Sequence, residues 1–179
     1  MKFYILDNNF YNKKIKEILK LKDYEIIRNN EGSRPYFYSV DINNKIILLP
    51  LRSNSSKISR ANKFRTKKVD KSRTSPAIDF TSLLVINRNE NSFLKEIILY
   101  REVSKFIKKN EKHLQKFFNY ILRYIKDKAL LIDTKTTDRS SLKYFHKELN
   151  LDENIMSKRK SVLINKLEKM GRVSFFKTS

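Results

Sequence analysis

The hydrophobic pattern of this chain changes near residue 90, and that change decides which folds are open to it. Before residue 90 the apolar residues lie in short runs rich in Ile, Val, Phe and Tyr, as in β-strands. After it they recur at spacings of three and four, as on one face of a helix. The sequence therefore predicts an α+β fold, with an antiparallel sheet from the first half flanked by helices from the second.

The first half contains four predicted strands and one short predicted helix. The Asn43–Asn44 pair predicts a two-residue hairpin turn between the second and third strands, because Asn tolerates the positive φ that such a turn requires. The apolar spacing within Asn12–Lys22 predicts a short amphipathic helix. The predicted strands are Lys2–Leu6, Tyr36–Ile42, Lys45–Leu51 and Ala77–Ile86.

The second half, residues 91–172, is predicted to be helical. Apolar residues from Phe93 to Ile107 and from Leu114 to Ile125 mark two helices, or one helix kinked at Asn110. A short helix is expected over 142–149 and a longer one over 155–170, ended by Gly171, with a last strand over 173–176. At 179 residues, the chain is expected to form one compact domain over its whole length.

The charge of the chain points to a polyanionic partner. Forty Lys and Arg against nineteen Asp and Glu give a formal net charge of +21, and nucleic acid is the leading candidate. A membrane is the other common polyanion, but no apolar run approaches the roughly 20 residues needed to span a bilayer. The apolar region Met1–Leu6 is too short for a signal peptide, so we expect a cytoplasmic protein.

The composition also excludes several chemistries. A chain without Cys has no thiol nucleophile, disulfide or cysteine-bound zinc, and two Gly are too few for a phosphate-cradling or dinucleotide-binding loop. No cofactor and no metal are expected. His113 and His146 lie on separate predicted helices, which disfavours a paired-histidine nuclease. The scattered carboxylates are expected to cap helices, form turns and balance charge: Asp7, Asp41, Asp79, Asp133 and Asp138.

The clearest electrostatic feature is residues 52–75, here called the basic segment. It contains nine cations against the single acid Asp70, with six Ser and two Thr interleaved, a mixture suited to phosphate oxygens. The alternative is a solvated, mobile loop without chemistry. The cations are Arg52, Lys57, Arg60, Lys63, Arg65, Lys67, Lys68, Lys71 and Arg73.

The position of the basic segment favours a role in RNA cleavage. It follows the apolar run Ile46–Leu51, so the core should hold Arg52 and Ser53 at a strand end while later residues can move. A ribose 2'-hydroxyl can attack its own 3'-phosphate without a metal if a base, an acid and cations are supplied. Arg52 could stabilise charge, Ser53 and Thr66 could bond phosphoryl oxygens, and Lys57 could serve as acid or base.

Three tyrosines near the same predicted edge are candidates for stacking on unpaired bases: Tyr11, Tyr36 and Tyr38. The alternative for each is partly buried structure. The full set of residues predicted to bind RNA is Tyr11, Tyr36, Arg60, Lys63, Arg65, Lys67, Lys68, Lys71 and Arg73.

Four short motifs in the first half, together with their order and spacing, resemble one family. They are Met1–Leu6 with Asn9-Phe10-Tyr11, Arg34-Pro35-Tyr36, Pro50-Leu51-Arg52-Ser53, and Ile78-Asp79-Phe80-Thr81. The combination resembles the ToxN/AbiQ-like type III toxins, particularly the TenpN and CptN branch, over roughly the first 90 residues.

This resemblance implies a strongly twisted antiparallel sheet, similar to the barrel-like core of the MazF and Kid toxins, surrounded by helices. It implies a metal-independent endoribonuclease that leaves a 2',3'-cyclic phosphate and a 5'-hydroxyl on cellular or phage RNA. It also implies inhibition by a small repeated antitoxin RNA, which the toxin processes and holds in a ring of alternating protein and RNA. A role in abortive phage infection would follow.

The resemblance carries over to the site residue by residue. Pro50, Leu51 and Ser53 match the active-site turn of the better-studied branch, where Arg52 stands in place of Thr and Ser55 in place of Lys. The TenpN-like branch has Arg-Ser at this turn with His or Lys shortly after, as in Arg52, Ser53 and Lys57. Arg34 falls near a Lys used by the first branch. The predicted catalytic set is Arg52, Ser53, Lys57, Thr66 and Arg34, with the division between acid and base left open.

The residues leave two further functions open. A non-catalytic RNA- or DNA-binding module explains the charge equally well and needs no special residue. A peripheral membrane protein would bind anionic vesicles with little preference for nucleic acid.

Overall fold

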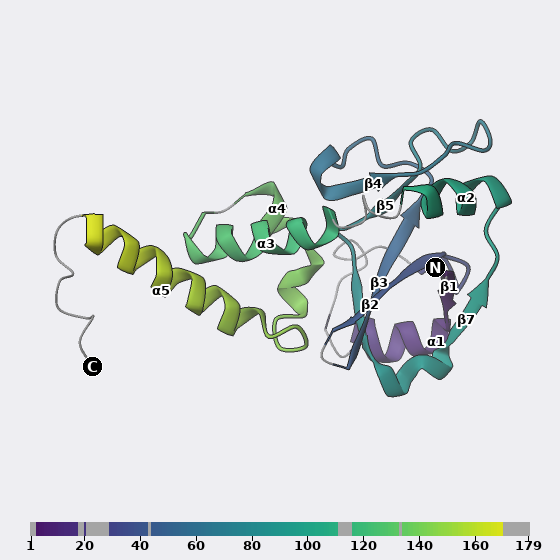
Figure 1. Cartoon of the computed structure of the whole chain (residues 1–179). Coiled ribbons are helices and arrows are strands. Elements are labelled where there is room, and N and C mark those ends of the chain that lie inside the picture. Colours follow the sequence, from purple (N-terminus) through teal and green to yellow (C-terminus); the bar gives the residue numbers. More distant parts are fainter. Residues whose placement is uncertain are drawn as a thin grey trace.

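The protein consists of a coiled β-sheet from which a helical arm extends (Figure 1). The computed structural model describes residues 3–17, 20, 29–42, 44–110, 116–132 and 134–169. The helical arm, residues 116–169, runs from α3 to α5 and extends away from the sheet (Figure 1).

The sheet has seven strands, and all of their pairings are antiparallel. Its order is β4-β5-β3-β2-β1-β7, with β6 also paired to β3. The path ends at β4 and β7, so the sheet is open where the resemblance implied a barrel-like core. The strands are β1 (Phe3–Leu6), β2 (Tyr36–Ile42), β3 (Lys45–Arg52), β4 (Lys63–Arg65), β5 (Ala77–Asp79), β6 (Leu84–Asn87) and β7 (Leu94–Ile97). The predicted α+β class is confirmed.

The central hairpin β2–β3 forms as predicted. Ile42 pairs with Lys45 across a two-residue turn, and Asn44 takes a φ of 62°, a left-handed conformation that Asn tolerates. Residues 46–50 of β3 are all buried, because β3 has neighbours on both edges. A continuous apolar run is what such a central strand requires.

The predicted strand Ala77–Ile86 is wrong as a single strand. It forms β5 and β6, which pair with the same edge of β3 on either side of a turn. On β3, the paired residues Leu48 and Leu51 are three positions apart. Their partners, Leu84 and Ile78, are six positions apart, so the partner segment contains extra residues. The extra residues form a turn that Asp79 stabilises, since its Oδ1 accepts the Thr81 backbone N–H at 2.8 Å.

The helix predicted to start at Phe93 is also wrong at its beginning. Residues Arg88–Phe93 form a 3₁₀ turn (η3), and Leu94–Ile97 form β7, which pairs along the whole of β1. The strand forms because β1 needs a partner on its second edge, and tertiary pairing overrides a short helical spacing. The helix itself, α2 (Arg101–Lys109), starts only after Tyr100.

Helices in the rest of the chain follow the predictions in part. Asp7 caps α1 (Asn8–Phe10) by accepting the Phe10 backbone N–H at 2.8 Å, as expected of a capping carboxylate. The chain continues from α1 into a π-helical stretch, η1 (Tyr11–Glu17), which overlaps the first part of the range predicted as helix. A second 3₁₀ turn, η2 (Arg60–Asn62), precedes β4.

The helical arm contains α3 (Lys116–Ala129), α4 (Lys135–Asp138), a 3₁₀ turn η5 (Ser141–Tyr144) and α5 (Leu151–Lys169). The predicted helix over 142–149 is therefore wrong beyond one short turn, whereas the longer helix after it is confirmed. The predicted helix end at Gly171 and the strand over 173–176 lie outside the described residues, as does Asn43.

The arm packs on the sheet at the turn between β5 and β6. The ring of Phe80 lies 5.7 Å from Phe117 and 6.3 Å from Tyr120, measured between centroids, and all three residues are buried. Ser141 donates its backbone N–H to Thr81 O at 2.8 Å and its hydroxyl to Leu83 O at 2.7 Å. One continuous apolar core therefore joins sheet and arm.

Candidate functional site

The last residue of β3 is held by a buried carboxylate. Arg52 Nε donates to Asp79 Oδ2 at 2.6 Å, and Arg52 Nη2 donates to Ser82 Oγ at 3.1 Å. The Asp79 side chain is fully buried, whereas the Arg52 side chain is 32% exposed. These contacts follow from the register, because Arg52 pairs with Ala77 two residues before Asp79. Arg52 thus presents a positioned guanidinium to solvent.

A second guanidinium lies beside the first. Arg34, just before β2, donates from Nη1 to Leu51 O at 3.1 Å and from Nη2 to Asn30 Oδ1 at 3.0 Å. Partial burial lowers the pKa of Arg34, and the charge of Arg52 acts in the same direction. Arginine stays protonated in proteins despite such shifts, so the two side chains place two positive charges together.

Backbone hydrogen bonds join the beginning of the basic segment to its end. Ser75 N donates to Ser53 O at 3.1 Å and Ser55 N donates to Ser75 O at 2.9 Å. Thr66 N donates to Pro76 O at 3.0 Å, next to the pairing of β4 with β5. Residues distant in sequence, Ser53, Thr66 and Arg73, are thereby brought to one place. The middle of the segment forms η2 and β4, so the segment is not an irregular loop throughout.

These side chains line a cleft with a volume of about 710 Å³. The opposite wall is formed where β7 leads into α2, by residues 97–100 and Val103. Two contacts join the basic segment to that wall: the Arg73 guanidinium lies 5.2 Å from the Tyr100 ring centroid, and Lys67 Nζ lies 3.0 Å from Glu102 Oε2. The polar and charged residues of the cleft are Asn30, Arg34, Arg52, Ser53, Thr66, Ser72, Arg73 and Tyr100.

The cleft unites most of the predicted catalytic set. Arg34, Arg52, Ser53 and Thr66 all line it. Lys57 is exposed on the turn before η2 and is not among the lining residues. The predicted acid or base is therefore the member of the set that the structure does not bring to the cleft.

The predicted RNA-binding cations divide among three surroundings. Arg73 lines the cleft, whereas Arg60, Lys63 and Arg65 line a separate hollow of about 380 Å³ with Phe106 and Lys116. Lys63 is buried and its Nζ donates to Ser55 O, and burial, reinforced by the charge of Arg65, lowers the pKa of Lys63. Its bond braces the basic segment. The exposed remainder is Lys67, Lys68 and Lys71.

The stacking role predicted for Tyr11 and Tyr36 is not available in this conformation. Both side chains are buried in the core, and the Tyr36 hydroxyl donates to Asn29 Oδ1 at 3.2 Å. Their rings form part of the apolar core, as in the alternative of buried structure. The side chain of Tyr38 lies outside the described residues. The aromatic residue at the cleft is Tyr100, 61% exposed, which sequence reasoning missed because it was assigned to a helix face.

His146 takes part in the packing of the helical arm. Its Nε2 lies 2.7 Å from the buried Tyr124 hydroxyl, and its Nδ1 lies 2.7 Å from Asp152 Oδ1 at the start of α5. The histidine thus links α3 to α5. His113 and Asp133 lie outside the described residues.

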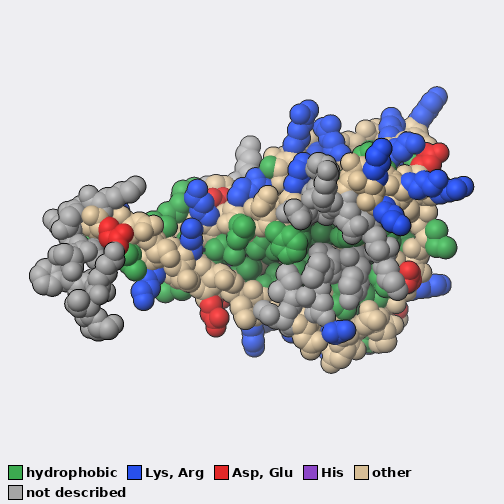
Figure 2. All heavy atoms as spheres, viewed as in Figure 1, with side chains coloured by type: hydrophobic (Ala, Val, Ile, Leu, Met, Phe, Trp, Pro, Cys, Tyr) green, Lys and Arg blue, Asp and Glu red, His purple; other side chains and the backbone are tan. Residues whose placement is uncertain are grey.

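Lys and Arg side chains gather on one part of the surface (Figure 2). They cover the upper rim of the view, over the loops around β4 and over α2, with few acidic side chains between them. The helices of the described ranges include none that is long and apolar enough to cross a bilayer. Nor do three potential metal-ligating side chains gather anywhere among the described residues.

Comparison with solved structures shows a likeness in fold. No protein-family model matches the chain, and no curated protein matches it. One similar solved structure comes from work on bacterial type III toxin–antitoxin systems that describes selective toxin inhibition by a non-coding RNA pseudoknot. It superposes with a TM-score of 0.52 at 15% identity, covering 90% of this chain and 96% of that one. The likeness is one of fold and extends over most of both chains.

Proposed function

We propose that this chain is a metal-independent endoribonuclease and the toxin of a type III toxin–antitoxin system, inhibited by a small repeated RNA. One observation carries the proposal: Arg34, Arg52, Ser53 and Thr66, from separate segments, line one cleft on a basic face. The similar fold from a toxin–antitoxin system inhibited by RNA supports the same function.

The cleft suits phosphoryl transfer within RNA. The 2'-oxygen attacks the adjacent phosphorus while the bond to the 5'-oxygen breaks, so the products are a 2',3'-cyclic phosphate and a 5'-hydroxyl. Extra negative charge develops on the phosphoryl oxygens, and fixed donors there lower the barrier most. A guanidinium has five N–H donors, and the bonds of Arg52 to Asp79 and Ser82 use two of them. Arg52 can therefore bind a phosphoryl oxygen while it stays in place.

The remaining roles follow from position in the cleft. Arg34 adds a second positive charge beside Arg52, and the hydroxyls of Ser53 and Thr66 donate to phosphoryl oxygens. The 2'-hydroxyl must lose a proton and the 5'-oxygen must gain one. Lys57 stays a prediction for one of these steps and reaches the cleft only if its turn shifts toward bound RNA.

The test is cleavage by purified protein in excess EDTA, with the RNA ends identified. We expect cleavage to persist and the 5' fragment to carry a cyclic phosphate. Cleavage that stops on chelation and returns with Mg²⁺ would exclude the proposal. The Arg52→Lys variant keeps the charge but loses the two-pronged donor, and we expect it to retain RNA binding while cleavage falls about 10²-fold.

A non-catalytic RNA-binding module is the second candidate. It is favoured by the absence of His, Asp, Glu and Lys from the described residues that line the cleft. A pure binder would show no cleavage of RNA in either the wild type or Arg52→Lys.

The inhibitor is proposed to be a repeated small RNA that occupies the same cleft and assembles with the protein into a ring. Loss of that RNA during phage infection would release cleavage of cellular or phage RNA. Tandem short repeats in the DNA upstream of the gene would support this partner, and co-expression of the repeats should abolish toxicity. Toxicity that persists with the repeats present would count against it.

A further inference from the structure

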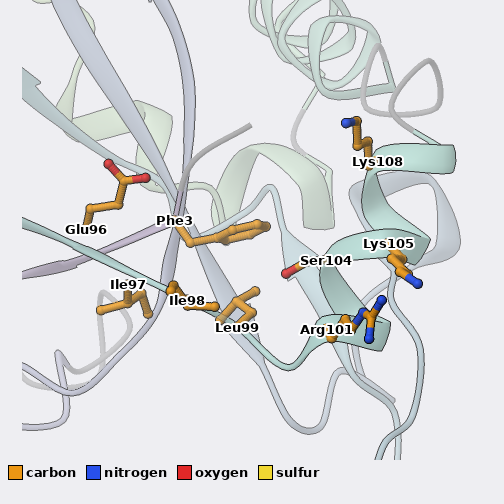
Figure 3. A pocket seen from close by; sticks show the side chains of 9 residues that line it. All are labelled: Phe3, Glu96, Ile97, Ile98, Leu99, Arg101, Ser104, Lys105 and Lys108. Carbon is orange, nitrogen blue, oxygen red and sulfur yellow. The ribbon is translucent and has the colours of Figure 1, made fainter.

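A second groove lies on the other side of the wall that closes the cleft. It runs between the β1–β7 edge of the sheet and α2 and has a volume of about 510 Å³. Figure 3 shows Phe3, Leu99 and Ser104 converging on the space between strand and helix. Phe3 is only 5% exposed and lines the groove together with Leu99, so the groove has an apolar base. This space is here called the α2 groove.

The helix wall of the α2 groove is basic. Arg101, Lys105 and Lys108 lie four and three residues apart, which places them along one face of α2. All three are exposed, and Glu96 is the one acidic residue among the described residues that line the groove. A ligand with an apolar part for the base and anionic parts for the rim would satisfy both walls.

The α2 groove and the cleft share a wall. Ile97, Ile98 and Leu99 line both. Between the two hollows Ile98 is 98% exposed, an unusual state for a branched apolar side chain. An extended polymer that leaves the cleft on this side passes over Ile98 and then meets the cations of α2.

We propose that the α2 groove binds a nucleotide of single-stranded RNA that extends out of the cleft. The base packs against Phe3 and Leu99, the flanking phosphates meet Arg101, Lys105 and Lys108, and Ile98 separates this base from its neighbour in the cleft. That the ligand is RNA rests on the function proposed above, whereas the place where it binds is inferred from the lining of the α2 groove. The α2 groove is thereby a second subsite that selects single strands.

The combination of an apolar base and a cationic rim in the α2 groove favours single-stranded RNA over other polyanions. An RNA duplex keeps its bases stacked inside and would meet only the cations, whereas unstacked bases seek apolar and aromatic surfaces. An acidic peptide or an anionic membrane would likewise need the charges of α2 but would have no use for the gap beside Phe3.

The test compares two lengths of non-cleavable 2'-O-methyl RNA, a dinucleotide that fits the cleft alone and an octanucleotide that spans both hollows. Affinities are measured by fluorescence anisotropy at fixed salt, since phosphate contacts depend on salt. The groove variant is Lys105→Glu with Lys108→Glu. The matched control, with the same change in charge, is Lys126→Glu with Lys166→Glu, two exposed lysines of the helical arm.

We expect the groove variant to lose at least about 10-fold in octanucleotide affinity and to bind the dinucleotide as the wild type does, with the control changed about 2-fold or less. Equal losses in the two variants would overturn the proposal, as would an equal loss for the two RNA lengths. Because the RNA cannot be cleaved, this result is independent of catalysis, and failure of the EDTA experiment would leave it standing.

A second measurement locates the base directly. A photoreactive 4-thiouridine at successive positions of the octanucleotide should crosslink to Phe3 or residues 97–108 at one position, and Ile98→Ala should weaken that crosslink. Crosslinks confined to residues 52–75 would overturn the proposal. So would competition by polyglutamate or phosphatidylserine vesicles that matches competition by RNA, because that result would indicate a general anion surface.

Discussion

The guanidinium of Arg52 meets the fully buried carboxylate of Asp79 with 2.6 Å between Nε and Oδ2. Asp79 also accepts the backbone N–H and the hydroxyl of Thr81 through its other oxygen. One carboxylate therefore fixes both the turn between β5 and β6 and the orientation of the arginine at the cleft. Asp79 is thus a positioning residue for Arg52.

Replacing Asp79 with Asn should uncouple these two roles. The amide oxygen can still accept from Thr81, but the neutral side chain no longer holds the Arg52 guanidinium. We expect kcat for RNA cleavage to fall about 10²-fold with little change in KM, because a small displacement of a catalytic group is costly. The free energy of unfolding should fall by roughly 1–3 kcal/mol, since Arg52 keeps contact with water. Glu153→Gln, exposed on α5, is the control, and an unchanged kcat in Asp79→Asn would contradict the assignment.

The variants Ser53→Ala and Lys57→Ala compare the effect on cleavage of a residue that lines the cleft, Ser53, with that of a residue that does not, Lys57. Both side chains are exposed, so urea unfolding should show changes within about 0.5 kcal/mol. We expect Ser53→Ala to lower kcat about 10²-fold through loss of a donor to the phosphoryl group, and Lys57→Ala to lower it less. A larger effect in Lys57→Ala would show that its turn moves into the cleft on RNA binding.

The parts of this fold that local chemistry controls could be predicted from the sequence. The hairpin at Asn44 and the position of Arg52 and Ser53 at a strand end both follow from short-range pattern. The second wall of the cleft could not, because residues 97–100 and Val103 reach it only through the pairing of β7 with β1. That pairing depends on contacts more than 80 residues apart in sequence, and no local spacing encodes it.

The same reason explains the misassigned tyrosines. Tyr11 and Tyr36 are expected near the predicted strand edge, but burial depends on what packs over them. Asn29, which accepts the Tyr36 hydroxyl, gave no signal of its own in the sequence. Tyr100 carries an exposed ring in the cleft because the chain there connects a strand to a helix, an arrangement visible only in three dimensions.

Tyr100 should provide the stacking surface that sequence reasoning placed on Tyr11 and Tyr36. With the Arg73 guanidinium over its ring, it presents an aromatic face and a charge to one nucleotide. We expect Tyr100→Ala to weaken RNA binding about 10-fold, within the 1–3 kcal/mol typical of a stacked base, and Tyr100→Phe to bind as the wild type does. Equal affinities of Tyr100→Ala and wild type would exclude this role. Because the ring is exposed, thermal unfolding should show little change in stability for either variant, and this measurement serves as the check.

Buried tyrosines should set the alkaline limit of stability. Burial raises the pKa of Tyr36 and Tyr120, and raises that of Tyr124 to about 12, from a value of 10.0 when unfolded. Because the folded pKa values are the higher ones, their contribution to stability is complete below pH 10 and is lost as the pH rises toward 12. Absorbance at 295 nm should therefore report ionisation of these tyrosines only together with loss of near-ultraviolet circular dichroism. Ionisation of all nine tyrosines before unfolding would contradict the prediction.

The pH dependence of cleavage should reveal what takes the proton from the 2'-hydroxyl. The described residues that line the cleft include no His, Asp, Glu or Lys, and its arginines keep their charge throughout the accessible range. We therefore expect log kcat to rise with a slope of about +1 from roughly pH 6 to pH 8.5, without the bell shape of a paired acid and base. The same slope in Lys57→Ala would assign the proton to solvent, whereas a slope lost in that variant would assign it to Lys57. A bell-shaped wild-type profile with a limb near pH 6.5 would contradict both assignments, because it requires a group titrating like histidine within reach of the cleft.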